Sequence, residues 1–491
     1  MRSAYQNMNK KQTKTKKRSW LINVIVILYT LITILFFGYI VCINMIPAKF
    51  LIPVVVLGIV ITLFVIFLMM KRRKTMIVNI IGVLLACGIV VGYGVIYNYL
   101  SQAFNFLDAI SVDQNVEVEQ FYVVALSDSE YKEQKDINGK EIEVLEITEN
   151  IDKVEEKLKQ EASTTFKNVD SLEKLEDNLL NGKADLILLS STQYSMITEE
   201  NEDFKEKTKV IYTITQEIET KNEEAIKDEN SKHTIENGVF NVYISGIDTS
   251  GNIRNVSRSD ANIVVTVNTN THEILLTSIP RDYYVTLHSK QAKDKLTHSG
   301  IYGINETVST VEDLLGIDIN YYVRVNFTTV EKLVDAIGGI EVYSDFAFTG
   351  VGIKFNKGLN YLNGKEALAF SRERHSFASG DVQRAKNQQK VINAIISKLT
   401  SSTTLLTKYS NILDSLSGNF QTNIETSDIS SIVKEQLNSM PSWNITTNTL
   451  IGTGSYDVTY SCGSQKLYVM VPNSESVEDA KQNINTVMGE D

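Results

Sequence analysis

Aspartate residues lie at the ends of apolar segments in the C-terminal half of this sequence. Asp248 follows the segment Phe240–Ile247, and Asp260 precedes the next segment, Ala261–Asn268. Ligands of open α/β sheets bind beyond the carboxyl ends of strands, and Mg²⁺ takes one or two carboxylates together with phosphate oxygens and water. The two aspartates therefore predict a magnesium site, while the simpler interpretation is that each caps a turn.

Two arginines, Arg372 and Arg374, lie on either side of Glu373. If this segment is extended, residues two apart share a face, and the two guanidinium groups point the same way. That arrangement favours an anion between them, because arginine makes planar, bidentate contacts with phosphate oxygens. A solvated group of surface charges is the alternative.

Another group of polar residues opens a helix that is predicted to begin at Asp381. The spacing of Asp381, Arg384 and Gln388 places all three on one helical face. Asp381 is expected to cap the helix or to lie in its first turn, and the N-terminus of a helix favours a nearby anion. A capped helix on the protein surface would explain the same residues without a ligand.

An arginine–aspartate pair, Arg281 and Asp282, follows Pro280, which ends a predicted strand and fixes the direction of the chain after it. A surface ion pair is the alternative.

The sequence contains no G-x-S-x-G, P-loop or H-E-x-x-H motif. Arginines and carboxylates without such a motif favour phosphoryl transfer, in which a metal ion and arginines stabilise negative charge and a carboxylate accepts a proton.

Segments of strand type and helix type alternate over residues 238–491 and must position these side chains. Helices on both faces of a central sheet are the natural packing for such a pattern, so we predict an α/β domain. Strands are expected at 240–247, 261–268, 273–279, 321–327, 340–343 and 466–471, and helices at 308–315, 328–336, 381–399 and 476–487.

A smaller α/β module is predicted within residues 101–230. Expected strands at 121–126, 184–190 and 209–214 alternate with helices at 151–160 and 172–180, which indicates a partly parallel sheet. Residues 217–237 are rich in Glu, Lys and Asn, as linkers are. No combination of residues capable of catalysis stands out in this module.

Three apolar segments, residues 20–46, 50–70 and 76–100, precede both modules. About 20 apolar residues span the ~30 Å core of a bilayer, so each segment is long enough to cross a membrane. The first is too long for the core of a signal peptide, and no small-residue cleavage site follows it. A helical hairpin buried in a soluble protein is the alternative.

Charge predicts the orientation of these three helices. Residues 1–19 carry seven Lys or Arg and no acidic residue, and residues 71–74 form a second basic cluster. Basic loops stay in the cytoplasm, which predicts three crossings and an extracytoplasmic position for residues 101–491.

The net charge of −11 argues against general nucleic-acid binding, and Cys42, Cys87 and Cys462 do not form a disulfide framework.

Taken together, the motifs of residues 238–491 resemble those of the LytR-CpsA-Psr (LCP) family of cell-wall polymer ligases. Each stretch alone is weak, but their common order and spacing are specific. The three apolar helices and the extra module make the chain similar to capsule-type members. The matching stretches are Gly246-Ile-Asp248, Arg258-Ser-Asp260, Ser278-Ile-Pro-Arg-Asp282, Lys295-Leu-Thr-His298, Asp335-Ala-Ile-Gly338-Gly339, Arg372-Glu-Arg374 and Asp381-Val-Gln-Arg384.

The resemblance implies a reaction and a fold. Family members transfer a glycan phosphate from a polyprenyl pyrophosphate to a muramic acid 6-hydroxyl of peptidoglycan, which forms a phosphodiester. The glycan would be capsular polysaccharide, teichoic acid or a similar polymer. The implied fold is an α-β-α sandwich with an apolar tunnel for the prenyl chain, and residues 261–267, 321–325 and 330–337 are expected to line the tunnel or to form ordinary core.

The resemblance also implies roles for individual residues. Asp248 and Asp260 would hold Mg²⁺, with Mn²⁺ as the alternative, against the pyrophosphate. Asp381 would be the catalytic base for the acceptor hydroxyl, with Asp282 as the second candidate, and Arg372 and Arg374 would take part in catalysis. The residues expected to bind the pyrophosphate oxygens are Arg258, Arg281, Arg372, Arg374, Arg384 and Gln388.

The sequence departs from the family pattern at two places. Thr297-His298-Ser299 stands where the family usually has Asn-His-Ala, and Asn387 stands where it often has arginine before a glutamine pair. One positive contact is therefore expected to be missing, which would alter polymer specificity. The other motif residues are intact, so an active enzyme is expected.

Two other functions are compatible with the same residues. One is a polyprenyl-pyrophosphate-glycan pyrophosphatase with water as the acceptor, and the other is a non-catalytic regulator of capsule synthesis whose accessory module binds capsule biosynthesis proteins. The predicted organisation is a basic cytoplasmic tail (1–19), three transmembrane helices (20–100), an accessory α/β domain with its linker (101–230) and a catalytic domain (231–491) of a multi-pass protein of the cell membrane.

Overall fold

The protein is described by a computed structural model. It covers residues 2–43, 47–70, 76–112, 116–219, 234–235, 237–247, 249, 252–400, 404, 408–416 and 418–490. Contacts within the chain divide it into two compact units. One unit contains Met1–Leu107 and Thr426–Met440, and the other contains Asp108–Glu425 and Pro441–Asp491.

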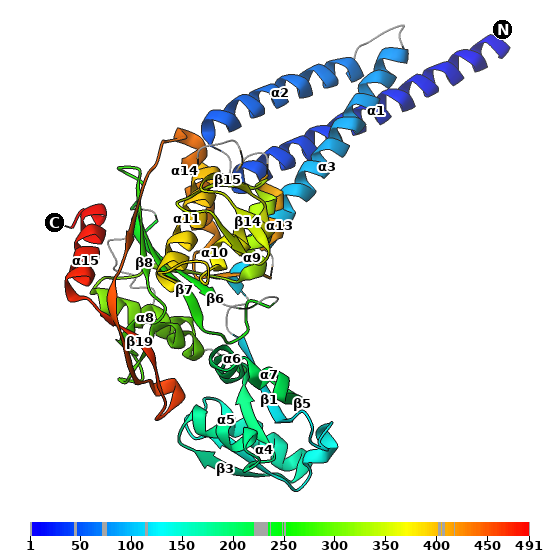
Figure 1. Ribbon diagram of the computed structural model, residues 1–491. Helices are drawn as coiled ribbons and strands as arrows, with labels where there is room; N and C mark the ends of the chain where they lie inside the picture. The colour runs from blue at the N-terminus through cyan, green and yellow to red at the C-terminus, as the bar shows by residue number, and fades with distance from the viewer. Residues whose placement is uncertain are drawn as a thin grey trace. The chain divides into compact units, whose positions relative to one another are not determined.

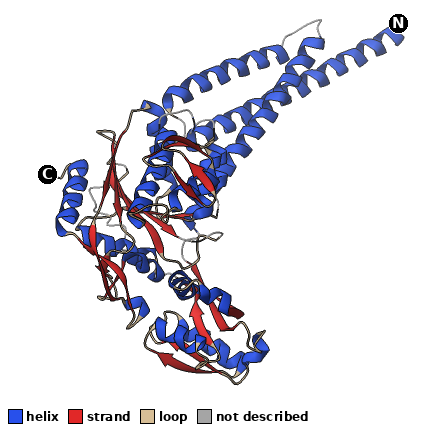
Figure 2. Cartoon of the chain, viewed as in Figure 1, coloured by secondary structure: helices blue, strands red, loops and turns tan. Residues whose placement is uncertain are grey.

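The first unit contains α1 (Arg2–Ile43), α2 (Ala48–Met70) and most of α3 (Met76–Val112), three long helices with apolar segments, which Figure 2 draws as helix along their described length. The segments Trp20–Cys42, Ala48–Met70 and Ile77–Asn98 are long and apolar enough to cross a membrane. Many of their large apolar side chains are exposed, as expected of surfaces that face lipid. The three predicted apolar helices are confirmed, and the basic cluster at 71–74 lies outside the described residues. Helix α14 (Thr426–Ser439) also belongs to this unit.

A six-stranded sheet forms the centre of the second unit, with the strand order β16-β11-β6-β7-β8-β17. Strands β6, β7 and β8 pair antiparallel, β11 is parallel to β6, and β17 is parallel to β8. The β-branched residues of Ala261–Asn268 favour the pleated conformation, and this strand is buried on both faces. The bounds are β6 (Val239–Ile247), β7 (Ser259–Asn268), β8 (Glu273–Ile279), β11 (Tyr321–Val325), β16 (Phe420–Thr422) and β17 (Asn444–Thr449).

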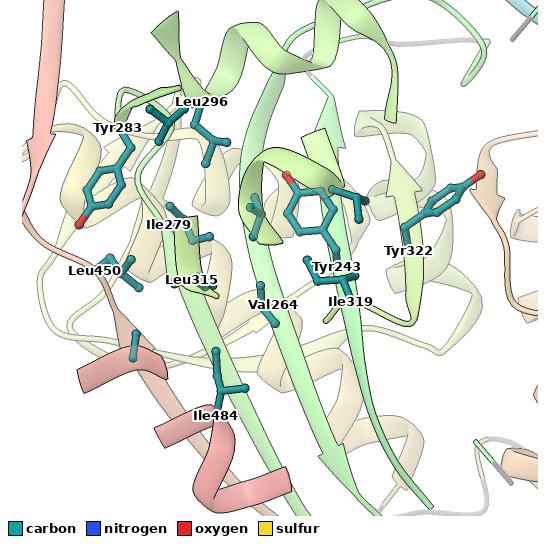
Figure 3. Packing of buried hydrophobic residues seen from close by; sticks show 14 of the residues in the cluster. Tyr243, Val264, Ile279, Tyr283, Leu296, Leu315, Ile319, Tyr322, Leu450 and Ile484 are labelled. Atoms are coloured by element: carbon teal, nitrogen blue, oxygen red, sulfur yellow. The ribbon is translucent and has the colours of Figure 1, made fainter. Parts of the chain in front are cut away.

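Helices cover both faces of this sheet, as Figure 1 shows for β6, β7 and β8. On one face, Tyr243 and Val264 of the sheet pack against Leu315 and Ile484 (Figure 3). On the other face, Ile263 and other sheet residues pack against α11. The first face is covered by α8 (Ile304–Leu315) and α15 (Ser474–Met488), and the second by α9 (Phe327–Ala336), α10 (Gly364–Arg372), α11 (Asp381–Thr400) and α13 (Tyr409–Leu416). The predicted α-β-α sandwich is confirmed.

Short elements complete this part of the unit as two-stranded ribbons and 3₁₀-helices. They include the connection that carries the Lys295–His298 motif. The ribbons are β9 (Tyr284–Thr286) with β10 (Lys293–Lys295), β12 (Ile340–Ser344) with β15 (Gly358–Leu362), β13 (Phe348–Gly350) with β14 (Ile353–Phe355), and β18 (Gly452–Val458) with β19 (Lys466–Pro472). The 3₁₀-helices here are η2 (Leu296–Tyr302) and η3 (Tyr460–Cys462).

A smaller, five-stranded sheet lies in the same unit, with the order β3-β2-β4-β1-β5. Strand β2 is parallel to β3 and β4, whereas β1 is antiparallel to β4 and β5, so the predicted partly parallel sheet is confirmed. Its strands are β1 (Val116–Leu126), β2 (Glu141–Leu145), β3 (Thr165–Val169), β4 (Ile187–Ser190) and β5 (Thr208–Glu219). Its helices are η1 (Gln134–Ile137), α4 (Ile151–Ala162), α5 (Leu172–Leu180), α6 (Ser191–Glu200) and α7 (Asp203–Lys207).

The small sheet and its helices together form residues 116–219, which we call the accessory module. This module shares packing and hydrogen bonds with the large sheet. Val118 of β1 exchanges backbone hydrogen bonds with Arg254 and Val256, each 2.9 Å long. Cys462 and Leu467 pack into the same apolar cluster as Met196 and the rest of the module core. These contacts make the two sheets parts of one continuous folded unit, which matters for the site described next.

Candidate active site

The edge of the large sheet brings together the ends of three strands. Ile247 at the end of β6 pairs with Ser259 at the start of β7, and Asn262 pairs with Ile279 at the end of β8. Asp260 and Arg281 therefore lie at the same edge. Asp248, predicted as a metal ligand, lies outside the described residues.

Asp260 is held by contacts from two neighbours. Arg281 Nη1 lies 3.2 Å from both carboxylate oxygens, and the Thr297 hydroxyl donates to Oδ1 across 2.8 Å. Burial would raise the pKa of Asp260, but the guanidinium groups of Arg281, Arg258 and Arg384 outweigh this effect and lower it to about 2. Asp260 is therefore a carboxylate at any physiological pH.

A second group of contacts surrounds Asp381, the first residue of α11. Its Oδ1 lies 2.5 Å from Arg384 Nη2 and 3.6 Å from Arg281 Nε. Burial raises the pKa of Asp381, while Arg384 and Arg281 lower it and the carboxylates of Asp282 and Asp260 raise it further, with a net rise. A carboxylate with a raised pKa, in contact with two guanidinium groups, suits a general base.

Of the predicted group Asp381, Arg384 and Gln388, only the first two contact each other. Asp381 lies in the first turn of α11, as predicted, and Gln388 lines a different part of the site, an apolar cavity. Asp381 Oδ1 forms ion pairs with Arg384 Nη2 and Arg281 Nε, but none of these three buried atoms makes a hydrogen bond of regular geometry within the described part of the chain. Buried polar groups are normally hydrogen-bonded, so these ion-paired atoms retain hydrogen-bonding capacity for a polar ligand.

The Lys295–His298 motif contacts two carboxylates of the site. Lys295 Nζ lies 3.2 Å from Asp282 Oδ1, and Thr297 donates to Asp260. His298 is buried, and its Nδ1 lies 2.6 Å from Asp294, which also accepts from the Ser461 backbone N–H across 2.8 Å. The threonine that replaces the family's asparagine thus keeps a polar contact to the carboxylate.

Arg372 and Arg374 do not share a face. The prediction of an extended segment is wrong, because the Asn363 capping box starts α10, and Arg372 is the last residue of that helix. Arg372 stacks on Phe327, with its guanidinium carbon 3.9 Å from the ring centre, and it borders the apolar cavity. Arg374 points elsewhere, with its Nη1 3.1 Å from Glu199.

An apolar cavity of about 230 Å³ opens beside these charged residues. Each segment that was expected to line a tunnel or to form core contributes to it, through residues such as Ala261, Val323 and Leu333. Asp260, Arg372 and Gln388 also border it. The site therefore joins an apolar chamber to a group of arginines and carboxylates.

Glu199 of the accessory module is the functional candidate that sequence reasoning missed. Its carboxylate contacts Arg258, Arg281 and Arg374, three of the predicted pyrophosphate-binding residues. It lies at the end of α6, in a module that was judged to be without catalytic residues. An isolated glutamate in an acidic region carries no motif, so no sequence signal pointed to it.

The described residues supply few ligands for a metal ion. No group of three or more His, Cys, Asp or Glu side chains is arranged as a metal site in that part of the chain. Asp260 is ionised and lines the cavity, which fits a hard cation that takes one carboxylate and completes its shell with phosphate oxygens and water. Asp260 would have to give up part of its contact with Arg281 to bind such an ion.

The sequence that forms this sandwich and its site matches the model of a known protein family. The chain belongs to the LytR_cpsA_psr family, whose model matches residues 207–482.

Several characterised proteins are similar to this chain. The polyisoprenyl-teichoic acid–peptidoglycan teichoic acid transferase TagU of Bacillus licheniformis is 37% identical over 191 residues, which are 39% of this chain and 61% of that protein. The protein of the same name from Bacillus subtilis is 39% identical over 186 residues, 38% of this chain and 60% of its own. The chain thus spans about three fifths of these relatives. The crystal structure of B. subtilis TagV is 30% identical, with a TM-score of 0.44 over 52% of this chain and 98% of that one.

Proposed function

We propose that this protein transfers a phosphate-linked glycan from a polyprenyl pyrophosphate to peptidoglycan. The observation that carries the proposal is the apolar cavity bordered by Asp260, Arg372 and Gln388. A lipid pyrophosphate needs both an apolar chamber for its chain and cations for its headgroup. The similarity to teichoic acid transferases that act on peptidoglycan supports the same reaction.

The reaction follows from the contacts at the site. Arg372 and Gln388, which line the cavity, would bind the pyrophosphate oxygens, and Arg281 and Arg384 would stabilise the charge that develops on the transferred phosphate. Asp381 would take the proton of the acceptor hydroxyl. The hydroxyl oxygen then bonds to the glycan-bearing phosphorus, the bond from that phosphorus to the bridging oxygen breaks, and polyprenyl phosphate leaves.

A divalent cation, Mg²⁺ or alternatively Mn²⁺, completes this proposal. When bound, it would neutralise charge on the pyrophosphate oxygens. Asp260 would hold it, and Asp248, which lies outside the described residues, is the second proposed ligand. The ionised state of Asp260 and its position beside the cavity support this assignment.

The three apolar helices support a membrane location, and we propose that they cross it three times. The basic residues at 1–19 and 71–74 would then face the cytoplasm, and residues 101–491 would lie outside it. Both the lipid-linked donor and peptidoglycan would be reached from that side. Labelling of an introduced cysteine at exposed Tyr361 with an impermeant maleimide on intact cells tests this orientation.

The reaction is tested with the full chain in lipid nanodiscs, a lipid-linked glycan donor and peptidoglycan fragments. The double variant Arg372→Ala/Arg374→Ala should lower the yield of peptidoglycan-linked glycan by about 100-fold or more, because two guanidinium groups predicted to bind the pyrophosphate are lost. Lys365→Ala, an exposed lysine on α10, is the matched control and should retain the yield. Unchanged linkage in the double variant would contradict the proposal, and glycan release that needs no acceptor would identify a pyrophosphatase instead.

A further inference from the structure

Helix α6 of the accessory module delivers an acidic side chain into the arginine group of the large sheet. Glu199 Oε2 lies 2.7 Å from Arg258 Nη1, and Glu199 Oε1 lies 2.7 Å from Arg281 Nη2 and 3.1 Å from Arg374 Nη1. One carboxylate therefore accepts from three guanidinium groups that come from three separate segments of the chain. Arginines converge in the same way on the oxygens of a phosphate.

The carboxylate of Glu199 is ionised in this environment. Burial would raise its pKa, but Arg258 and Arg281 outweigh this effect and lower it far below the ordinary value. Glu199 thus offers these arginines a permanent negative charge. A phosphate group offers them the same chemistry with more charge and more acceptor oxygens.

The contacts with Glu199 occupy donors that a pyrophosphate would use. Arg258 donates from Nη1 to Glu199 and from Nη2 to Ser195, while Arg281 donates from Nη1 to Asp260 and from Nη2 to Glu199. Both arginines are buried, so neither can swing far to reach a second anion. A pyrophosphate that receives the N–H groups now bonded to Glu199 must therefore take the place of its carboxylate.

The structure allows Glu199 to leave by rotation of its own side chain. Helix α6 is fixed by a capping box between Ser190 and Gln193 and by buried Met196 and Ile197. Glu199 lies in the last turn of this helix, and 23% of its side chain is exposed. An exchange of anions thus needs no movement of the accessory module.

We propose that Glu199 is an internal substitute for the donor's pyrophosphate. It pairs with Arg258, Arg281 and Arg374 before the donor binds, and the pyrophosphate displaces it. The inference rests on the proposed function, since it takes pyrophosphate to be the ligand of these arginines. It gives the accessory module a defined task, which is to set the affinity of the donor site and to exclude weaker anions from it.

The test compares the full chain in nanodiscs with Glu199→Gln, which keeps the shape of the side chain, removes its charge and replaces one acceptor oxygen by an amide donor. Binding of inorganic pyrophosphate and of geranylgeranyl pyrophosphate is measured by calorimetry. Both dissociation constants should fall about tenfold, because the ligand no longer competes with a charged carboxylate for three guanidinium groups. Glu200→Gln, one residue further along and exposed, is the matched control and should bind as the unmodified chain does.

Unchanged or weaker binding in Glu199→Gln would overturn the inference, and so would an equal gain in Glu200→Gln, which would indicate a general charge effect. Glu199→Asp keeps the charge but shortens the side chain, so its pyrophosphate dissociation constants should lie below those of the unmodified chain but fall by less than about tenfold. It serves as the second variant if Glu199→Gln does not fold.

The outcomes separate this inference from the proposed function. Tighter pyrophosphate binding in Glu199→Gln without ligation by any variant would keep the inference and remove the ligase assignment. If the unmodified chain ligates but Glu199→Gln binds pyrophosphate with unchanged affinity, the ligase assignment would stand and this inference would be wrong.

Discussion

The guanidinium group of Arg324, on β11 of the large sheet, donates to the carboxylate of Glu117, on β1 of the accessory module, across 2.8 Å. Arg324 also donates to the Asn255 carbonyl across 3.2 Å, and both charged side chains are buried. This ion pair connects the two sheets within the interior, next to the backbone hydrogen bonds of Val118. It is a structural link between the module that carries Glu199 and the sheet that carries the arginines.

Replacement of Arg324 alone should destabilise the protein strongly. Arg324→Met leaves the carboxylate of Glu117 buried without its cation, and such changes cost about 3–5 kcal/mol. Denaturant-induced unfolding, followed by circular dichroism of the full chain in detergent, measures the change in midpoint. The double variant Glu117→Met/Arg324→Met should recover most of the loss, because an apolar pair needs no desolvated charge. Equal midpoints for Arg324→Met and the unmodified chain would show that the pair contributes little.

The raised pKa of Asp381 should appear in the pH profile of the reaction. A base must be deprotonated, so kcat/KM should fall as the pH falls through the pKa of Asp381, which burial places above the ordinary value of 3.8. Removing the positive charge in Arg384→Gln should raise that pKa further and move the acid limb to higher pH. The measurement is the rate of ligation against pH for both proteins. An acid limb that moves to lower pH, or does not move, would contradict the assignment.

Replacement of Asp381 separates the two candidate bases. Asp381→Asn should lower the ligation rate by about 10²–10⁴-fold, the usual contribution of a general base, with little change in donor affinity. Asp282 contacts Lys295 and is the second candidate from the sequence. If Asp282→Asn shows the larger loss and abolishes the acid limb, the roles of the two aspartates are exchanged.

The proposed cation predicts a specific response to chelation. EDTA should abolish ligation, and Mg²⁺ or Mn²⁺ should restore it. Asp260→Asn should need a higher cation concentration for half-maximal rate, because an amide is a weaker ligand than a carboxylate. The rate is titrated against cation for both proteins, with Asp313→Asn, at an exposed position on α8, as the control. Full activity in EDTA would remove the metal from the proposal.

Most strands and helices could be predicted from the sequence because their apolar residues follow the periods of the two structures. Residues 261–268 and 273–279 are buried strands, and 151–162 is a helix with one apolar face, as the pattern indicates. The prediction failed at Arg372, where short-range charge spacing suggested an extended segment. The capping box at Asn363 and the buried Phe370 instead continue a helix up to this arginine.

The sequence predicted those site residues that lie at the ends of strands or at the start of a helix. Asp260 and Arg281 contact each other because they lie at the ends of neighbouring buried strands, and Asp381, at the start of α11, contacts Arg281. Glu199 could not be predicted, since its contacts join residues far apart in sequence and depend on how the accessory module packs. Asn387, expected to mark a lost positive contact, is buried, and its amide donates to the Phe370 carbonyl in α10.

The apolar cavity should set the response of the enzyme to the length of the prenyl chain. Val323 of β11 lines this cavity of about 230 Å³, so Val323→Phe should fill part of it and exclude long chains. Over-filled apolar space typically costs about 1–3 kcal/mol, so the KM for an undecaprenyl donor should rise roughly tenfold or more while that for a short-chain donor changes little. Val210→Phe, at an exposed position on β5, is the matched control. An equal rise for both chain lengths would point to a general loss of folding, and no rise for either would show that the prenyl chain binds elsewhere.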